Sequence, residues 1–140
     1  MVRLGRVPEA VWHWEQALRI KPDYAEAHND LGAELAQRGD FENAIRHYEQ
    51  ALRIEPGYAK AHNNLGNALT RAGRLGDAIG HYEQALRIKP DFAEAHYNLA
   101  VALELSGQTE DAIEHYEQAV RIKPDFAAAR NRLARLRVIQ

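Results

Sequence analysis

The 140-residue chain contains no cysteine, and its only serine and threonine residues are Ser106, Thr70 and Thr109. Without cysteine there are no disulfides, thiolate metal ligands or cysteine nucleophiles, and three hydroxyl side chains leave little material for a serine or threonine nucleophile. The chain has no apolar run long enough to cross a bilayer, and its N-terminal stretch lacks the uninterrupted apolar core of a signal peptide. We therefore expect a protein that is not an enzyme, with the cytoplasm as its default location.

The chain also lacks a strong excess of charge of either sign. Its net charge of -2 gives no general attraction to nucleic acid or to an anionic membrane. Apolar residues make up 46% of the chain and charged residues 27%, which is typical of a globular protein rather than a disordered one.

One eight-residue segment recurs along the chain. HYEQALRI occupies residues 47–54 and again 81–88, and close variants occupy 13–20 and 115–122. The spacing of 34 residues indicates units that are each too small to bury an apolar face alone and must stack on their neighbours. We expect one solenoid domain over 1–140, with a half unit at 1–24, full units at 25–58, 59–92 and 93–126, and a terminal helix at 127–140.

Within each unit the apolar residues are spaced as on two helices. In the first full unit, Ala27, Leu31 and Leu35 follow one helical stripe, and Ala44 to Leu52 carry a second. Glycines at 39, 73 and 107 suit the left-handed residue just past a helix end, and prolines at 22, 56, 90 and 124 end the second helix of each unit. Asp23 and Asp91, each with a glutamate three residues on, predict a capping box before the next helix.

These residues resemble the tetratricopeptide repeat family, and in particular the repeats of O-GlcNAc transferase and bacterial relatives. The resemblance rests on the period of 34, Leu-Gly in the first helix, Ala, Tyr and Ala in the second, and the closing proline. It implies an all-α fold, a right-handed superhelical solenoid of antiparallel helix pairs, with the first helix of each unit lining a concave groove. It further implies a non-catalytic scaffold that binds a protein or peptide without a cofactor.

Asparagines are concentrated at first-helix positions, although their amides compete for backbone hydrogen bonds and disfavour a helix interior. A row of amides offers donors and acceptors to an extended peptide backbone. Asn64 and Asn98 match the asparagine ladder of O-GlcNAc transferase repeats, from which Asp30 and Arg132 depart. The groove residues that the resemblance implies are Asn29, Lys60, Asn63, Asn64, Asn67, Arg71, Tyr97, Asn98, Asn131, Arg132 and Arg135. The alternative is that these side chains only keep a groove soluble.

All seven histidines fall into two columns of the repeat. No two lie three or four residues apart on one helix, and no cysteine could complete a site, so the spacing argues against a metal. Recurrence in register is typical of packing positions, and we expect a pH-sensitive stability instead.

Trp12 has Arg46, Gly80 and Glu114 as its equivalents, which are residues typical of exposed positions, so a tryptophan there suggests that a partner covers it. We expect self-association in which the helix at 127–140 of one molecule completes the unit begun by residues 7–21 of the next, in head-to-tail order. The residues assigned to this contact are Trp12, Trp14, Leu133 and Leu136. The alternative is a fragment of a longer array.

Two other functions fit a helical repeat. One is RNA binding by repeats that read one base per unit, against which the neutral charge argues. The other is a consensus-like array with no specific ligand, which the near-identical second helices suggest.

Overall fold

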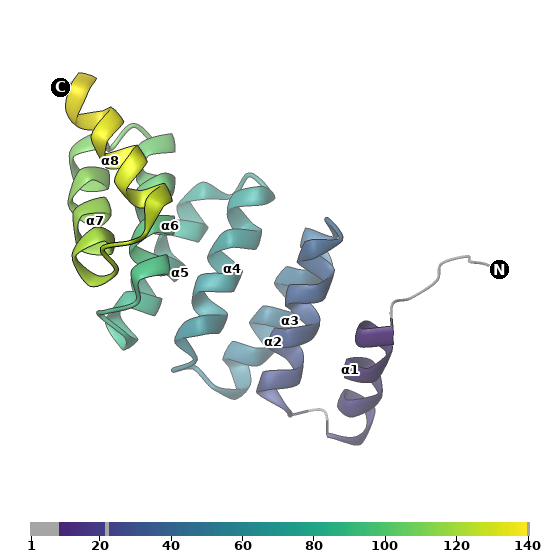
Figure 1. Ribbon diagram of the computed structural model, residues 1–140. Coiled ribbons are helices and arrows are strands. Elements are labelled where there is room, and N and C mark those ends of the chain that lie inside the picture. The colour runs from purple at the N-terminus through teal and green to yellow at the C-terminus, as the bar shows by residue number, and fades with distance from the viewer. Residues whose placement is uncertain (1–8, 22, 140) are drawn as a thin grey trace.

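The computed structural model describes residues 9–21 and 23–139, and these residues are helical apart from short turns (Figure 1). The helices are α1 (Glu9–Ile20), α2 (Ala25–Gln37), α3 (Phe41–Ile54), α4 (Ala59–Arg71), α5 (Leu75–Ile88), α6 (Ala93–Leu105), α7 (Thr109–Ile122) and α8 (Ala127–Ile139). None of the helices in these ranges is long and apolar enough to cross a membrane.

The helices stack in chain order into a solenoid (Figure 1). The tightest packing lies within the pairs α2/α3, α4/α5 and α6/α7, and each second helix then packs on the first helix of the next pair. The first helices also contact one another, α2 with α4 and α4 with α6. We infer that the first helices line the inner side of the curve.

The turn inside each pair is built as the sequence predicts. Gly39, Gly73 and Gly107 have φ angles of 83°, 83° and 84°, a left-handed conformation that other residues adopt only with strain. The chain then closes with a backbone hydrogen bond, as from the Asp40 N–H to the Leu35 carbonyl at 2.9 Å. The next helix can therefore fold back against the one before it.

The predicted capping boxes do not form. The residues that cap α2, α4 and α6 are Tyr24, Tyr58 and Phe92, and none of them makes a side-chain cap hydrogen bond. Asp91 lies one residue too early to cap α6. These aromatic residues are instead half-buried, so packing rather than capping positions the start of each first helix.

The core depends on close approach between the two helices of a pair. Tyr48, Tyr82 and Tyr116 on the second helices are buried, and the Tyr48 and Tyr82 rings lie against Gly32 and Gly66 on the first. An ideal Cβ added at Gly66 would lie 2.4 Å from Tyr82 Cε1, so the glycine makes room for the ring. Glycine at this position of the first helix therefore allows the two helices of a pair to approach closely.

Candidate functional site

The asparagines of the first helices are joined from one pair to the next. Asn64 Nδ2 donates to Asn29 Oδ1 at 3.0 Å, and Asn98 Nδ2 donates to Asn63 Oδ1 at 3.0 Å. Asn29 and Asn63 are only 1% and 6% exposed, so both lie beneath the groove surface rather than on it. Their role in the structure is to hold Asn64 and Asn98, which are half-buried at that surface.

These hydrogen bonds fix the orientation of the two surface amides. Each uses one N–H, which leaves the second N–H and the carbonyl oxygen of Asn64 and of Asn98 without a hydrogen bond to the described part of the chain. An amide held in this way can donate and accept at once. It also loses little side-chain entropy on binding, because the rotamer is already set.

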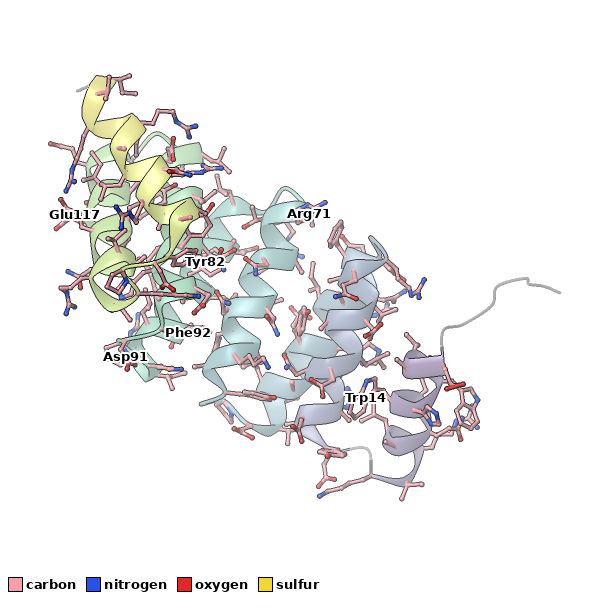
Figure 2. The ribbon with its side chains drawn as sticks, in the orientation of Figure 1. Trp14, Arg71, Tyr82, Asp91, Phe92 and Glu117 are labelled. Carbon is pink, nitrogen blue, oxygen red and sulfur yellow. The ribbon has the colours of Figure 1, made fainter. Side chains whose placement is uncertain are left out.

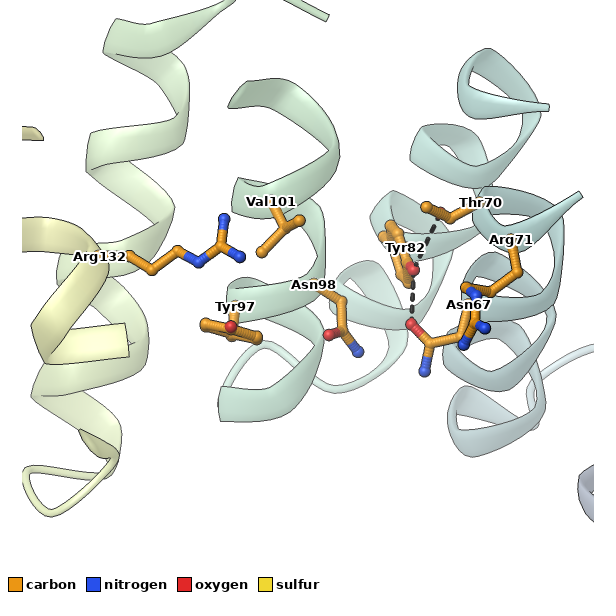
Figure 3. Close-up of a pocket in the computed structure, with 8 residues that line it drawn as sticks. All are labelled: Asn67, Thr70, Arg71, Tyr82, Tyr97, Asn98, Val101 and Arg132. Atoms are coloured by element: carbon orange, nitrogen blue, oxygen red, sulfur yellow. Dashed lines mark hydrogen bonds between the residues drawn. The ribbon is translucent and has the colours of Figure 1, made fainter. Parts of the chain in front are cut away.

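Asn98 borders a cavity of about 570 Å³ between α4, α5, α6 and α8 (Figure 3). In Figure 3, Arg132 lies on one side of the cavity, Asn67 and Arg71 lie on the other, and Asn98 projects between them. The residues that line it are Asn67, Thr70, Arg71, Tyr82, Tyr97, Asn98, Val101 and Arg132.

Asn64 borders a second cavity, of about 310 Å³, on the neighbouring helices α2, α3 and α4. Asn67 and Arg71 line both cavities, so the two cavities are adjacent along the first helices. We call the two cavities together the groove. Its remaining lining residues on this side are Ala33, Ala36, Gln37, Phe41, Tyr48 and Ala68.

Second-helix residues form part of the groove floor, which the sequence did not predict. Tyr82 donates from its hydroxyl to Asn67 Oδ1 at 2.6 Å, and Phe41 lies under the Arg71 guanidinium at 4.9 Å from the ring centre. Periodicity assigns Tyr82 to a packing column and cannot show that its hydroxyl reaches through to the groove. The only indication in the sequence is that Asn67 and Thr70, which lie next to that hydroxyl on α4, are polar.

Charged residues lie at both ends of the row of first helices. At the α8 end, Arg132 Nη1 lies 3.5 Å from Glu104 Oε1, which also accepts from the Tyr116 hydroxyl at 2.8 Å. Burial and then this hydrogen bond raise the pKa of Tyr116. At the α2 end, burial and then neighbouring Glu26 raise the pKa of Asp30. Asp30 and Glu26 thus lie on α2 outside the two cavities, whereas Arg132 lines the larger cavity at the α8 end.

Three of the other residues predicted for the groove lie outside the two cavities. Lys60, Asn131 and Arg135 are exposed, and Lys60 acts on the α2 end only as a charge that lowers the pKa of Asp30. Tyr97 packs against Phe126, with ring centres 5.0 Å apart, and forms part of the larger cavity wall.

The residues predicted for self-association are split. Trp12 is 50% exposed, and Trp14 is half-buried on α1 at one end of the stack (Figure 2). Leu133 and Leu136, in contrast, are buried in the core of their own chain. Both leucines pack inward and offer little surface to a partner.

The two histidine columns meet in space, which the spacing along single helices did not indicate. Each first-helix histidine faces the second-helix histidine 19 residues later, with Nδ1 atoms 3.0 to 3.1 Å apart. In the part of the chain that the structure describes, no group of three or more metal-ligating side chains comes together.

Comparison with known proteins defines the family. Residues 29–91 and 64–127 match the tetratricopeptide repeat family, and residues 2–33 match a second profile, described as a TPR repeat. The chain therefore belongs to the tetratricopeptide repeat family, whose members are generally interaction modules without catalysis. No curated protein sequence matches it significantly.

Solved structures with the same fold include the crystal structure of MamA, at 25% identity and a TM-score of 0.84, over 90% of this chain and 74% of that one. A MamA RS-1 ArsTM double mutant is 25% identical, with a TM-score of 0.85, over 98% of this chain and 77% of that one. The first TPR domain of Spaghetti (RPAP3), solved with the HSP90 peptide SRMEEVD, is 19% identical, with a TM-score of 0.80, over 82% of this chain and 91% of that one. All three are similar in fold along most of this chain.

Proposed function

We propose that this protein interaction scaffold binds an extended peptide segment in the groove, with Asn64 and Asn98 holding the peptide backbone. One observation carries the proposal: each of the two amides is fixed by a buried asparagine of the preceding pair. A side chain that served only solubility would need no such support, whereas an amide that must meet a peptide group at a set place does.

The chemistry of the two amides fits a peptide backbone. An extended chain presents alternating N–H and C=O groups, and an asparagine side chain can pair with both. Contacts of this kind hold the ligand without reading its side chains. Specificity then has to come from the cavities beside each asparagine.

The larger cavity favours an acidic group on the ligand. Arg71 and Arg132 reach it from opposite sides, and among the described residues no acidic side chain lines it, although Glu104 lies 3.5 Å from Arg132 behind it. Arginine binds carboxylates through paired N–H donors. We therefore place an acidic residue or a terminal carboxylate of the peptide between these two arginines.

The test is selection from a display library of unstructured peptides, followed by fluorescence anisotropy with the selected peptides. Asn64→Ala combined with Asn98→Ala should weaken binding at least about tenfold, the effect of one to two lost hydrogen bonds. Asn131→Ala is the matched control, because Asn131 is an exposed asparagine outside both cavities. Equal binding by the double variant and the wild type would refute the proposal.

The two arginines allow a second comparison with the same peptides. Arg71→Gln with Arg132→Gln should weaken acidic peptides and remove most of the salt dependence of their binding. Arg135→Gln, an exposed arginine outside the cavities, should leave both unchanged. If neutral and acidic peptides suffer alike, the arginines do not bind a carboxylate.

A second proposed function is self-association of α8 of one copy with α1 of another. Exposed apolar side chains at the two ends of the stack favour it, with Trp12 50% exposed on α1 and Val138 84% exposed on α8. Scattered single apolar residues are common on surfaces, so the argument depends on whether the two faces fit.

The contact between α4 and α5 provides the template for that fit. There the Tyr82 ring packs on Gly66, and its hydroxyl lies 3.4 Å from Thr70 Oγ1. Counted by the period of 34, Trp14 on α1 occupies the position of Tyr82. A tryptophan ring at this position is larger than that of tyrosine and carries an indole N–H in place of the hydroxyl.

The α8 face offers the matching surface. Ala134 occupies the position of Gly66, and the exposed Val138 occupies that of Thr70. Thr70 pairs with the Tyr82 hydroxyl, and because Trp14 has no hydroxyl, an apolar valine can stand at the equivalent position. Light scattering over a dilution series tests the contact. Val138→Asp should lower the mass of any oligomer and Ile88→Asp, an exposed isoleucine on α5, should not. A mass of one chain at every concentration would refute it.

A further inference from the structure

Three histidine pairs join the two helices of the pairs α2/α3, α4/α5 and α6/α7. The Nδ1 atoms are 3.1 Å apart in His28/His47 and in His62/His81, and 3.0 Å apart in His96/His115. The rings are stacked in each pair, with centres 5.2 to 5.3 Å apart. The same geometry therefore recurs once in every helix pair.

A backbone carbonyl sets the tautomers in two of the pairs. His62 Nε2 lies 3.0 Å from the Pro56 carbonyl oxygen, and His96 Nε2 lies 2.9 Å from that of Pro90. A carbonyl oxygen only accepts, so each Nε2 carries the hydrogen. In the neutral ring Nδ1 is then an acceptor, and the facing Nδ1 of the second-helix histidine must be the donor.

This arrangement limits the number of protons that a pair can hold. A first added proton can go to Nε2 of His81, which leaves the Nδ1–H of His81 pointing at the Nδ1 acceptor of His62. A second proton must go to Nδ1 of His62. Two N–H donors on two cations would then face each other at about hydrogen-bond distance, with no acceptor between them.

We propose that the three histidine pairs form a proton-controlled latch: each pair holds its two helices together with up to one added proton and releases them when it takes a second. The fourth position of the first-helix histidine column is consistent with a latch of three pairs, because it is not a histidine. It is Arg130, whose Nη1 donates to the Pro124 carbonyl at 3.1 Å and keeps the backbone contact without a titrating ring.

Charged groups face the pairs from several helices. The pair His62/His81 is approached by Glu49 of α3 and by Asp77 of α5, both of which raise the pKa of His81. Burial is the larger effect, and it lowers the pKa of both His62 and His81 below the ordinary value of 6.5.

The other two pairs have cations nearby. Burial lowers the pKa of His96 and His115, and Arg121 of α7 lowers that of His96 further while Asp111 raises that of His115. For His47, burial, His28 and then Arg46 lower the pKa. Glu15 and Arg19 of α1 border the cavity next to this pair and bring one charge of each sign.

The sign of the pH effect follows from these shifts. A histidine whose pKa is lower in the folded state contributes its full stability above 6.5, the unfolded value, and loses it as the pH falls toward the folded value. Since the unfolded chain can charge both histidines of a pair and the folded pair only one, unfolding takes up about one proton per pair, roughly three in total. The equilibrium constant of unfolding should therefore rise with roughly the third power of the proton concentration.

The experiment measures the urea unfolding constant between about pH 8 and pH 5, the range in which histidine titrates. Asparagine is the informative replacement for the second-helix histidine, because its amide can donate to a neutral Nδ1 and accept from a charged one. His81→Asn should reduce the proton uptake by about one, and His47→Asn, His81→Asn and His115→Asn together should remove about three.

His13→Asn is the matched control, since His13 is an exposed second-helix histidine that faces no first-helix histidine in the described residues. It should leave the proton uptake unchanged. An unchanged uptake in His81→Asn, or an equal loss in His13→Asn, would overturn the latch.

Nitrogen NMR of the wild type is the second measurement, independent of the variants. Nε2–H tautomers at His62 and His96 with Nδ1–H at His81 and His115 are expected, and the reverse would refute the arrangement.

Discussion

Gly66→Ala tests the packing of the solenoid at its tightest point. The added Cβ would lie 2.4 Å from Tyr82 Cε1 and 2.7 Å from Cδ1, closer than any ordinary contact. The ring cannot move away freely, because it is 2% exposed and its hydroxyl donates to Asn67 Oδ1 at 2.6 Å. The substitution must displace the ring, bend the hydrogen bond or push α4 and α5 apart.

Two opposing contributions set the expected change in the free energy of unfolding. Alanine is the better helix former by about 1 kcal/mol, whereas overpacking a filled core costs about 1 to 3 kcal/mol. Gly66→Ala should therefore be destabilising by up to about 2 kcal/mol. Gly80→Ala on α5 meets no atom within 4 Å, so it should show the helix gain alone, about 1 kcal/mol of stabilisation.

Urea denaturation followed by far-UV circular dichroism measures both variants against the wild type. The pair α6/α7 shows why the context matters: Ala100 stands in the column of Gly66, but the Tyr116 hydroxyl there donates to Glu104 rather than to a residue at the position of Asn67. If Gly66→Ala proved as stable as Gly80→Ala, the close approach of ring and helix would not be a constraint on the fold.

Three further predictions concern individual residues. Asp40→Ala should cost about 1 kcal/mol in urea denaturation, since Asp40 accepts from the Asn43 backbone N–H at 3.3 Å and caps α3. Gly107→Ala should cost roughly 1 to 2 kcal/mol because its φ is 84°, and a gain in stability would contradict this. Burial raises the pKa of Tyr82 to about 12 from 10.0, so the unfolded chain ionises first. Stability should be full below pH 10 and fall as the pH rises toward 12, which tyrosinate absorbance and denaturation measured together would check.

Periodicity was enough to predict the elements of the fold. Apolar spacing, the turn glycines and the prolines place every helix pair, because each of these signals is local and recurs in every unit. The predicted capping boxes failed for a physical reason: Asp23 and Asp91 precede aromatic residues whose burial decides where the next helix begins. A local hydrogen bond of that kind loses to packing against the neighbouring unit.

The candidate site could be predicted only in part. Asparagine in a helix interior is unusual enough to mark Asn64 and Asn98, but only the family resemblance singles them out, because helix propensity does not separate them from Asn29 and Asn63, which the fold buries beneath them. The histidine pairs escaped notice because their members lie 19 residues apart on different helices. Contacts that depend on how two helices are turned toward each other leave no periodic signal within either one.

The central claim is that an extended peptide lies along the first helices and bonds to Asn64 and Asn98. The most direct measurement is NMR of the side-chain amides of the isotope-labelled protein during titration with the tightest peptide from the library. The Asn64 and Asn98 amide signals should shift with saturation while that of Asn131 stays in place. Shifts confined to residues on the outer faces of α3, α5 and α7, with the two groove asparagines unmoved, would contradict the account.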